Sequence, residues 1–164
     1  MNKICCVFGH RKLKKDNRFL KRLEREAENL ITEQKVDTFL FGSKSDFNSI
    51  CYDVITTLKS KYPHIKRIYV RAEFPCIDES FEQYLLGKYE QSFFPKEIEG
   101  SGKAVYVERN CRMIDMSSFC IVYYNEEYKY PHRKSGTKTA FEYAKRKNKI
   151  IINIYKKEKS QVKT

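Results

Sequence analysis

The sequence predicts an α/β protein with a Rossmann-like three-layer sandwich around a mainly parallel sheet. Short apolar segments alternate with longer ones whose apolar residues recur every three to four positions, which is the pattern of buried strands and amphipathic helices in turn. A β-α-β-α-β order of this kind favours parallel strands covered by helices on both faces. The 164 residues, 41% of them apolar with only six Gly and four Pro, are enough for one compact core.

The first half of the chain carries the clearest elements. A buried strand is predicted over KICCVF, and an amphipathic helix follows with Asp16 or Asn17 as its cap. The predicted bounds in this half are a strand at 3–8, a helix at 16–34, a strand at 37–42, a helix at 45–62 and a strand at 65–72.

The second half begins with a less regular stretch, 72–103, which holds two of the four prolines. We predict a short helix within 79–91 and an exposed loop at 97–103. After it, 104–117 is predicted to be a brief strand followed by a helix. The remaining predictions are a strand at 119–125, a polar loop at 126–134, a helix at 136–148 and a closing strand at 149–155.

Domain organisation and location follow from what the sequence contains. We expect a single domain over 1–155 and a basic tail over 156–164. No apolar run approaches the roughly 20 residues of a membrane helix, and the N-terminus is too quickly polar for a signal peptide, so we expect a cytoplasmic protein without a membrane partner. The six cysteines show no CxxC or Cys/His spacing, so we expect reduced, mostly buried thiols, no metal and no cofactor.

The net charge of +12 is the strongest signal in the composition, and it indicates anionic partners. A second interpretation is equally open at this stage: lysine-rich helix faces and a basic tail also keep a protein in solution. The basic clusters are spread over several predicted elements, so the sequence alone does not place them on one face.

Candidate binding residues follow the predicted strands. In an open parallel sheet, ligands bind beyond the carboxyl ends of the strands. Small residues and polar donors stand there at 9–11, 42–46, 108–110 and 135–137. Glycine lets the backbone approach a ligand, and the free amide groups of a helix's first turn bind anions. The sequence therefore predicts a ligand cleft that recognises phosphate.

Four segments, VFGHRKL, FGSKSDFNSI, ERNCRMIDMSSFCIVYYN and SGTKTAFEYAKRKNKIIINI, resemble the motif set of the SLOG superfamily. This superfamily joins the DNA-processing protein Smf/DprA with the Lonely Guy (LOG) phosphoribohydrolases. The likeness is greatest to its small, stand-alone bacterial branch, typified by the YpsA-like proteins. The resemblance implies a Rossmann-like fold, a site for nucleotides or nucleotide-derived ligands, and a homodimer.

The resemblance also implies which residues contact the ligand. Arg11 is alternatively a solvated cation, Asp46 a helix cap and Met113 a core residue. His10 and His132 lie in loops near the predicted site and are candidate donors to phosphate. The full set of expected ligand contacts is Gly9, His10, Arg11, Gly42, Ser43, Asp46, Arg109, Asn110, Met113, Ser135, Gly136 and Thr137.

The sequence departs from the LOG enzymes at the catalytic acid. In those enzymes the resemblance implies a glutamate three residues after the threonine of the glycine-rich turn. Counted from Thr137, that position is Ala140 here. Glu142 lies about 200° around the helix from Ala140, because each residue turns an α-helix by about 100°. Two other acids, Glu108 and Asp46, are the remaining catalytic candidates.

Three functions compete at this stage. The first is binding or sensing of a nucleotide-derived small molecule, such as an ADP-ribose-like or cyclic nucleotide-like ligand, because the phosphate turn is present without the expected acid. The second is a LOG-type nucleotide N-glycoside hydrolase with an altered acid. The third is a DprA-type single-stranded DNA-binding protein, which the positive charge and the aromatic content permit.

Overall fold

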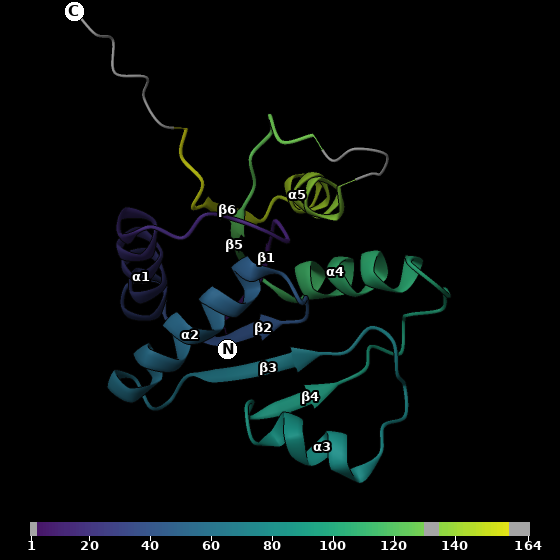
Figure 1. Ribbon diagram of the computed structural model, residues 1–164. Helices are drawn as coiled ribbons and strands as arrows, with labels where there is room; N and C mark the ends of the chain where they lie inside the picture. Colours follow the sequence, from purple (N-terminus) through teal and green to yellow (C-terminus); the bar gives the residue numbers. More distant parts are fainter. Residues whose placement is uncertain (1–2, 130–134, 158–164) are drawn as a thin grey trace, which may run out of the picture.

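The computed structural model describes residues 3–129 and 135–157, and it shows a six-stranded sheet with helices on both faces (Figure 1). Every strand pairing in these ranges is parallel, which confirms the predicted fold class. The spatial order is β4-β3-β2-β1-β5-β6. The strands are β1 (Lys3–Gly9), β2 (Val36–Phe41), β3 (Lys66–Val70), β4 (Gln91–Phe93), β5 (Phe119–Tyr123) and β6 (Ile150–Asn153).

In the ranges that the structure describes, five helices accompany the sheet, and residues of four of them belong to two hydrophobic clusters on its opposite faces. Alternate residues of a strand point to opposite faces. Cys5 and Val7 of β1 therefore pack with the first two helices, whereas Cys6 and Phe8 pack with the last two. The helices are α1 (Asn17–Thr32), α2 (Asp46–Lys61), α3 (Glu79–Leu86), α4 (Ala104–Met116) and α5 (Gly136–Arg146). Figure 1 shows α3 beside β4 at one edge of the sheet.

The order of the strands fixes where a ligand can enter. The chain builds the sheet outward from β1 to β4 and then crosses back to add β5 on the other side of β1. Such a reversal leaves a crevice beyond the carboxyl ends of the strands. Gly9 at the end of β1 pairs with Tyr123 of β5, and Phe41 of β2 pairs with Tyr69 of β3. These four strand ends therefore lie at one edge.

The structure corrects one predicted element and adds another. Residues 104–116 form a single helix, α4, without the brief strand that was predicted at its start. Val105, Arg109 and Met113 are buried on one side of it, four residues apart, and this helical spacing outweighs the β-forming tendency of the Val-Tyr-Val run. The short edge strand β4 was not predicted, because three residues give too little alternation to detect.

Other predictions concern the caps, the cysteines and the tail. Asp16 caps α1 as predicted, accepting a hydrogen bond of 2.8 Å from the backbone amide of Phe19. The six cysteines are free thiols and four of them are buried. In the described part of the chain, no helix is long and apolar enough to cross a membrane. The predicted tail lies outside the described residues from residue 158 onward, and the single-domain organisation stays a prediction.

Candidate functional site

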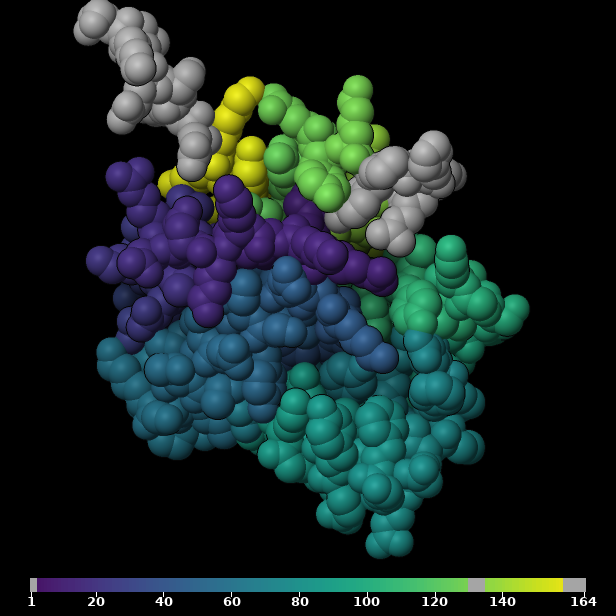
Figure 2. All heavy atoms as spheres, in the orientation of Figure 1, coloured from purple at the N-terminus to yellow at the C-terminus, as the bar shows by residue number. Residues whose placement is uncertain are grey.

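A cleft of about 620 Å³ lies over the carboxyl ends of β1, β2 and β3. The first turns of α4 and α5 form its walls, together with the segment that follows β3. In Figure 2 the segment after β1, in purple, lies beside the blue residues that follow β2. The two segments are joined by a 2.8 Å hydrogen bond from the amide of Asp46 to the carbonyl of Arg11. We call this site the strand-end cleft.

Arg109 is the most unusual residue of the cleft. Only 4% of it is exposed, yet in the described chain it forms no ion pair with a carboxylate. Its Nη1 donates a hydrogen bond to the carbonyl of Gly42, and its Nε donates to the side-chain oxygen of Asn110 at 3.3 Å. Burial lowers the pKa of Arg109 to about 10, so the side chain is still a cation at neutral pH.

A buried cation of this kind favours an anionic ligand. Removing a guanidinium from water costs free energy that hydrogen bonds to neutral groups recover only in part. A phosphate in the cleft would supply the missing opposite charge in a bidentate geometry that suits arginine. The centre of the Tyr106 ring lies 5.7 Å from the guanidinium carbon, within the range of a cation–π contact.

The N-terminus of α5 provides a second feature that suits phosphate. Ser135 caps this helix by accepting a 3.1 Å hydrogen bond from the amide of Lys138, and the first turn holds no acidic residue. Gly136 has no neighbouring atom within 4 Å of the place where a Cβ would stand, so its backbone is open to the cleft. The free amides and the helix dipole there attract anions.

Charge and aromatic content distinguish the cleft from an ordinary surface hollow. Its lining contains five cationic side chains and, among the described residues, one carboxylate, which belongs to Glu73 and accepts a hydrogen bond from the hydroxyl of Tyr106. Four aromatic side chains stand among these charges. The cations are Arg11, Lys44, Arg71, Lys103 and Arg109, and the aromatic residues are Tyr69, Phe74, Phe81 and Tyr106.

The structure brings nine of the twelve expected ligand contacts into this cleft. Sequence positions up to 128 residues apart meet there, because the strands are parallel and end together. These residues are Gly9, Arg11, Gly42, Ser43, Arg109, Asn110, Ser135, Gly136 and Thr137. Whether they contact a ligand stays a prediction.

The other three expected contacts lie outside the lining of the cleft. His10 is 2% exposed, its Nε2 accepts a 2.8 Å hydrogen bond from the amide of Asn125, and burial lowers its pKa. Met113 is a buried residue of α4 and packs in the hydrophobic core. Asp46 begins α2, and its Oδ2 accepts a 3.4 Å hydrogen bond from the amide of Leu13. These side chains support the loops and helices around the cleft.

The catalytic candidates also lie outside the lining. Ala140 is 2% exposed and packs in the core, whereas Glu142 is exposed on the opposite side of α5. Glu108 is half-buried, and its Oε2 accepts a 3.0 Å hydrogen bond from the amide of Gly100. His132 falls outside the described residues. In the described ranges, no cluster of His, Cys, Asp or Glu side chains is arranged to hold a metal ion.

Several lining residues were missed by the sequence analysis, and two signals could have found them. The end of β3 was not inspected, although Tyr69 and Arg71 stand there as the general rule for parallel sheets requires. Because a strand was wrongly predicted from residue 104, Lys103 and Tyr106 were not recognised as residues at the start of a helix. The helical spacing of Val105, Arg109 and Met113 is the signal that could have found them. The missed residues are Tyr69, Arg71, Ala72, Glu73, Phe74, Phe81, Lys103, Tyr106 and Val107; the lining also includes Lys44 and Ser45, from the candidate segment 42–46.

Comparison with known proteins shows a similarity in fold. No protein-family model matches the chain, and no curated protein matches its sequence. The fold is similar to that of DNA processing protein A from Helicobacter pylori. The two share 15% sequence identity with a TM-score of 0.57, and the similarity covers 91% of this chain. That solved structure was reported for a unique mode of single-stranded DNA binding by the Helicobacter protein.

The comparison agrees with the predicted resemblance at the level of the fold. DNA processing protein A belongs to the Smf/DprA group that the sequence motifs indicated, and the assignment to the YpsA-like branch stays a prediction. The matched region makes up 63% of the Helicobacter chain, so this protein corresponds to part of that structure.

Proposed function

We propose that this protein binds single-stranded nucleic acid in the strand-end cleft. The observation that carries the proposal is the buried guanidinium of Arg109, which has no carboxylate partner in the described chain and faces a cleft with four further cations. The similar fold of a protein reported to bind single-stranded DNA supports it. This function is the third of the three candidates that the sequence offers, and the charge and aromatic lining of the cleft, together with that similar fold, support it over the other two.

The cleft offers both kinds of contact that a single strand needs. Cationic side chains and the amides of α5 neutralise the phosphates, which provides affinity without regard to sequence. Aromatic side chains provide faces on which bases stack. Tyr106 and Phe74 are 40% and 55% exposed, so both rings are accessible to a base that enters the cleft.

Binding of a nucleotide-derived small molecule is the second candidate. The observation that favours it is the size of the cleft, about 620 Å³, which falls within the range of roughly 300–1,000 Å³ that is typical of small-molecule pockets. The same cations and amides would hold one diphosphate or a cyclic phosphate. The two candidates differ in how many phosphates are neutralised, and this number can be measured.

Titration of a fluorescent twelve-nucleotide single strand at 50–200 mM salt separates these candidates. If several phosphates are bound, log affinity should fall linearly with log salt concentration, with a slope of about −0.7 per contact and thus about −3.5 for the five lining cations. Arg109→Met should weaken binding at least tenfold. Arg25→Met is the matched control, because Arg25 lies on α1 and its side chain is 61% exposed.

The small-molecule candidate predicts the opposite pattern. A single nucleotide would then bind as tightly as the oligonucleotide, and the affinity would change little with salt. Equal loss of affinity in Arg109→Met and Arg25→Met would show diffuse attraction to a basic surface, and the cleft would no longer be the proposed site.

A further inference from the structure

The strand-end cleft is too small to hold the whole of a bound strand. Its volume of about 620 Å³ is typical of a pocket for one small molecule, of roughly 300–1,000 Å³, and corresponds to about one or two nucleotides. A longer strand that enters this cleft must therefore continue over the surface beside it. The charges on the surrounding segments decide which side it takes, because every phosphate is negative.

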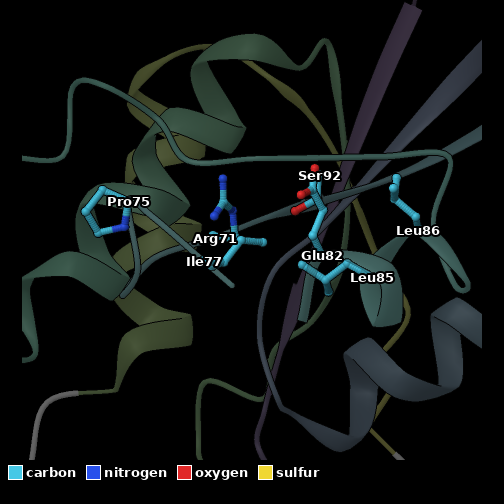
Figure 3. Close-up of a pocket in the computed structure, with 7 residues that line it drawn as sticks. All are labelled: Arg71, Pro75, Ile77, Glu82, Leu85, Leu86 and Ser92. Carbon is cyan, nitrogen blue, oxygen red and sulfur yellow. The ribbon is translucent and has the colours of Figure 1, made fainter. Parts of the chain in front are cut away.

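The side of α3 is the least suited to a strand. The segment 72–82, which leads from β3 into α3, holds four acidic residues and no lysine or arginine. A hollow of about 140 Å³ lies on this side, between α3 and the ends of β3 and β4 (Figure 3). Among the described residues its lining has one cation, Arg71, and one carboxylate, that of Glu82, so it adds no net positive charge.

The side of α4 has no excess of positive charge either. The segment 94–103, between β4 and α4, holds two lysines and two glutamates. Glu97 of this segment forms an ion pair of 3.4 Å with Arg112 of α4, so that cation is already partnered. Of the two lysines, Lys103 belongs to the cleft itself, where it is one of the five lining cations. This side therefore offers little to further phosphates.

The segment that joins β1 to α1 differs from both. Residues 11–18, which we call the basic segment, carry five exposed cations and one acidic residue, Asp16, whose carboxylate caps α1. In the described ranges, none of the five cations forms an ion pair. Figure 1 shows the basic segment, in purple, running from the end of β1 to α1. The cations are Arg11, Lys12, Lys14, Lys15 and Arg18.

The basic segment is held in place beside the cleft. The amide of Asp46 donates a 2.8 Å hydrogen bond to the carbonyl of Arg11, and Oδ2 of Asp46 accepts a 3.4 Å hydrogen bond from the amide of Leu13. The side chain of Leu13 packs against the hydrophobic core. Because the backbone is fixed at these points, less free energy is lost in ordering the segment when a ligand binds to its lysines.

Arg11 connects the basic segment to the cleft. It lines the cleft together with Lys44, and the other cations of the segment follow it along the chain toward α1. Proteins that bind single strands without regard to sequence use a positively charged path of this kind, which follows the sugar-phosphate backbone.

We propose that a single strand bound in the strand-end cleft leaves it over the basic segment, where Lys12, Lys14 and Lys15 neutralise further phosphates. This inference rests on the proposed function, and it adds the path of the strand and a binding site longer than the cleft. It also gives a role to part of the net charge of +12, which the sequence alone does not place on any one face.

The test compares a twelve-nucleotide oligo-dT strand with the dinucleotide of thymidine, which the cleft accommodates by itself. The four cations beyond Arg11 should steepen the salt slope of the longer strand from about −3.5 toward about −6.3, at about −0.7 for each of nine contacts. A triple variant, Lys12→Gln with Lys14→Gln and Lys15→Gln, should bind the longer strand at least tenfold more weakly at 50 mM salt. Its slope should be shallower by about 2, and its affinity for the dinucleotide should stay within twofold of the wild type.

A second triple variant is the matched control: Lys145→Gln with Arg146→Gln and Lys147→Gln. It removes the same charge, but from the end of α5 opposite to Gly136, which lines the cleft. This variant should change the affinity for the longer strand by less than threefold. Circular dichroism checks that both triple variants are folded.

The outcomes separate this inference from the proposed function. Equal loss of affinity in the two triple variants would show attraction to net charge alone and would overturn the path. Loss in Arg109→Met without loss in the basic-segment variant would overturn the path and leave the cleft as the binding site. Loss in the basic-segment variant without loss in Arg109→Met would remove the cleft, and with it a path that begins there. If neither ligand binds at 50 mM salt, the proposed function and the path both fail.

Discussion

Gly42 and Arg109 meet at the floor of the strand-end cleft in a contact that only glycine permits. A Cβ on Gly42 would stand 2.8 Å from Cδ of Arg109 and 3.0 Å from the carbonyl oxygen of Val70. The carbonyl of Gly42 accepts a hydrogen bond from the same arginine. The side chain of Arg109 therefore connects the first half of α4 to the end of β2, both by this hydrogen bond and by close packing against Gly42.

We predict that Gly42→Ala lowers both stability and ligand affinity. The added methyl group has no free space, because one of its neighbours is backbone, so Arg109 must move. Overpacking of this kind costs about 1–3 kcal/mol, and displacement of the guanidinium should weaken oligonucleotide binding at least tenfold. Urea denaturation and binding titration measure the two effects.

Gly136→Ala is the matched control for this prediction. No atom lies within 4 Å of the added carbon there, so stability should stay the same or rise by a few tenths of a kcal/mol. Equal stability of the two variants would show that Arg109 adjusts freely and that the contact with Gly42 is not tight.

Our second prediction concerns the N-terminus of α5. Gly136→Asp places a carboxylate where the free amides would bind phosphate, and the open space around Gly136 accommodates it. A carboxylate in the first helical turn stabilises the helix itself. We therefore expect affinity for the oligonucleotide to fall at least tenfold without loss of thermal stability. Unchanged affinity in calorimetric titration would remove the α5 terminus from the site.

The fold was predictable because the core pattern is regular. The apolar run from Cys5 to Phe8 predicts a buried strand, and the apolar spacing in α1 and α2 predicts amphipathic helices. The alternation of strands and helices then predicts a parallel sheet. The strand order, with β5 on the far side of β1, needs the structure, because helix-spaced and strand-spaced segments do not specify which strands are neighbours.

The site was predictable only in part, because some of its residues belong to types that mark a strand end in the sequence and others do not. Gly42 and Gly136 stand out in the sequence as small residues after strands. Tyr106 and Arg71, which also line the cleft, do not stand out, because aromatic and basic residues are common in helices and on surfaces that bind nothing. His10 shows the converse: it follows a strand beside Gly9, yet its side chain turns toward Asn125 and is buried.

Our third prediction concerns the ion pair that fixes β3 to the segment before β4. Arg67 binds Glu90 through its guanidinium at 2.8 Å and through its backbone amide at 2.6 Å. Burial by itself would raise the pKa of Glu90, but these two hydrogen bonds and the charge of Arg67 hold it below its ordinary value. The ion pair therefore adds stability above the unfolded pKa of about 4.3, and this is lost as pH falls through the lower folded pKa.

Glu90→Gln should accordingly lower the free energy of unfolding by about 1–3 kcal/mol at pH 7, because the half-buried guanidinium loses its charged partner. As the pH falls from 7 toward 2.5 the wild-type carboxyl gains a proton, and the difference in stability between the two proteins should shrink. Urea denaturation at both values measures this. Glu24→Gln, at an exposed position on α1, should show no difference at either pH. A destabilisation by Glu90→Gln that is independent of pH would contradict an electrostatic origin.

The last prediction is that the wild type releases no free base from nucleoside monophosphates. Hydrolysis of an N-glycosidic bond needs a carboxylate placed against the ribose, and misplacement by even about 1 Å costs on the order of a hundredfold in rate. Asp46, Glu108 and Glu142 lie outside the lining of the cleft. Among the described residues only Glu73 lines it, and its carboxylate is engaged by the hydroxyl of Tyr106.

Chromatography of nucleoside monophosphates incubated with the protein decides this, with Glu73→Gln, Asp46→Asn, Glu108→Ala and Glu142→Ala alongside the wild type. We expect all five traces to match the buffer blank. Turnover that only Glu73→Gln abolishes would show that a wall of the cleft supplies the acid from a new position, because no other described carboxylate reaches the lining. Turnover lost in Glu142→Ala would require α5 to rotate by about half a turn, since Ala140 and not Glu142 packs inward in this structure.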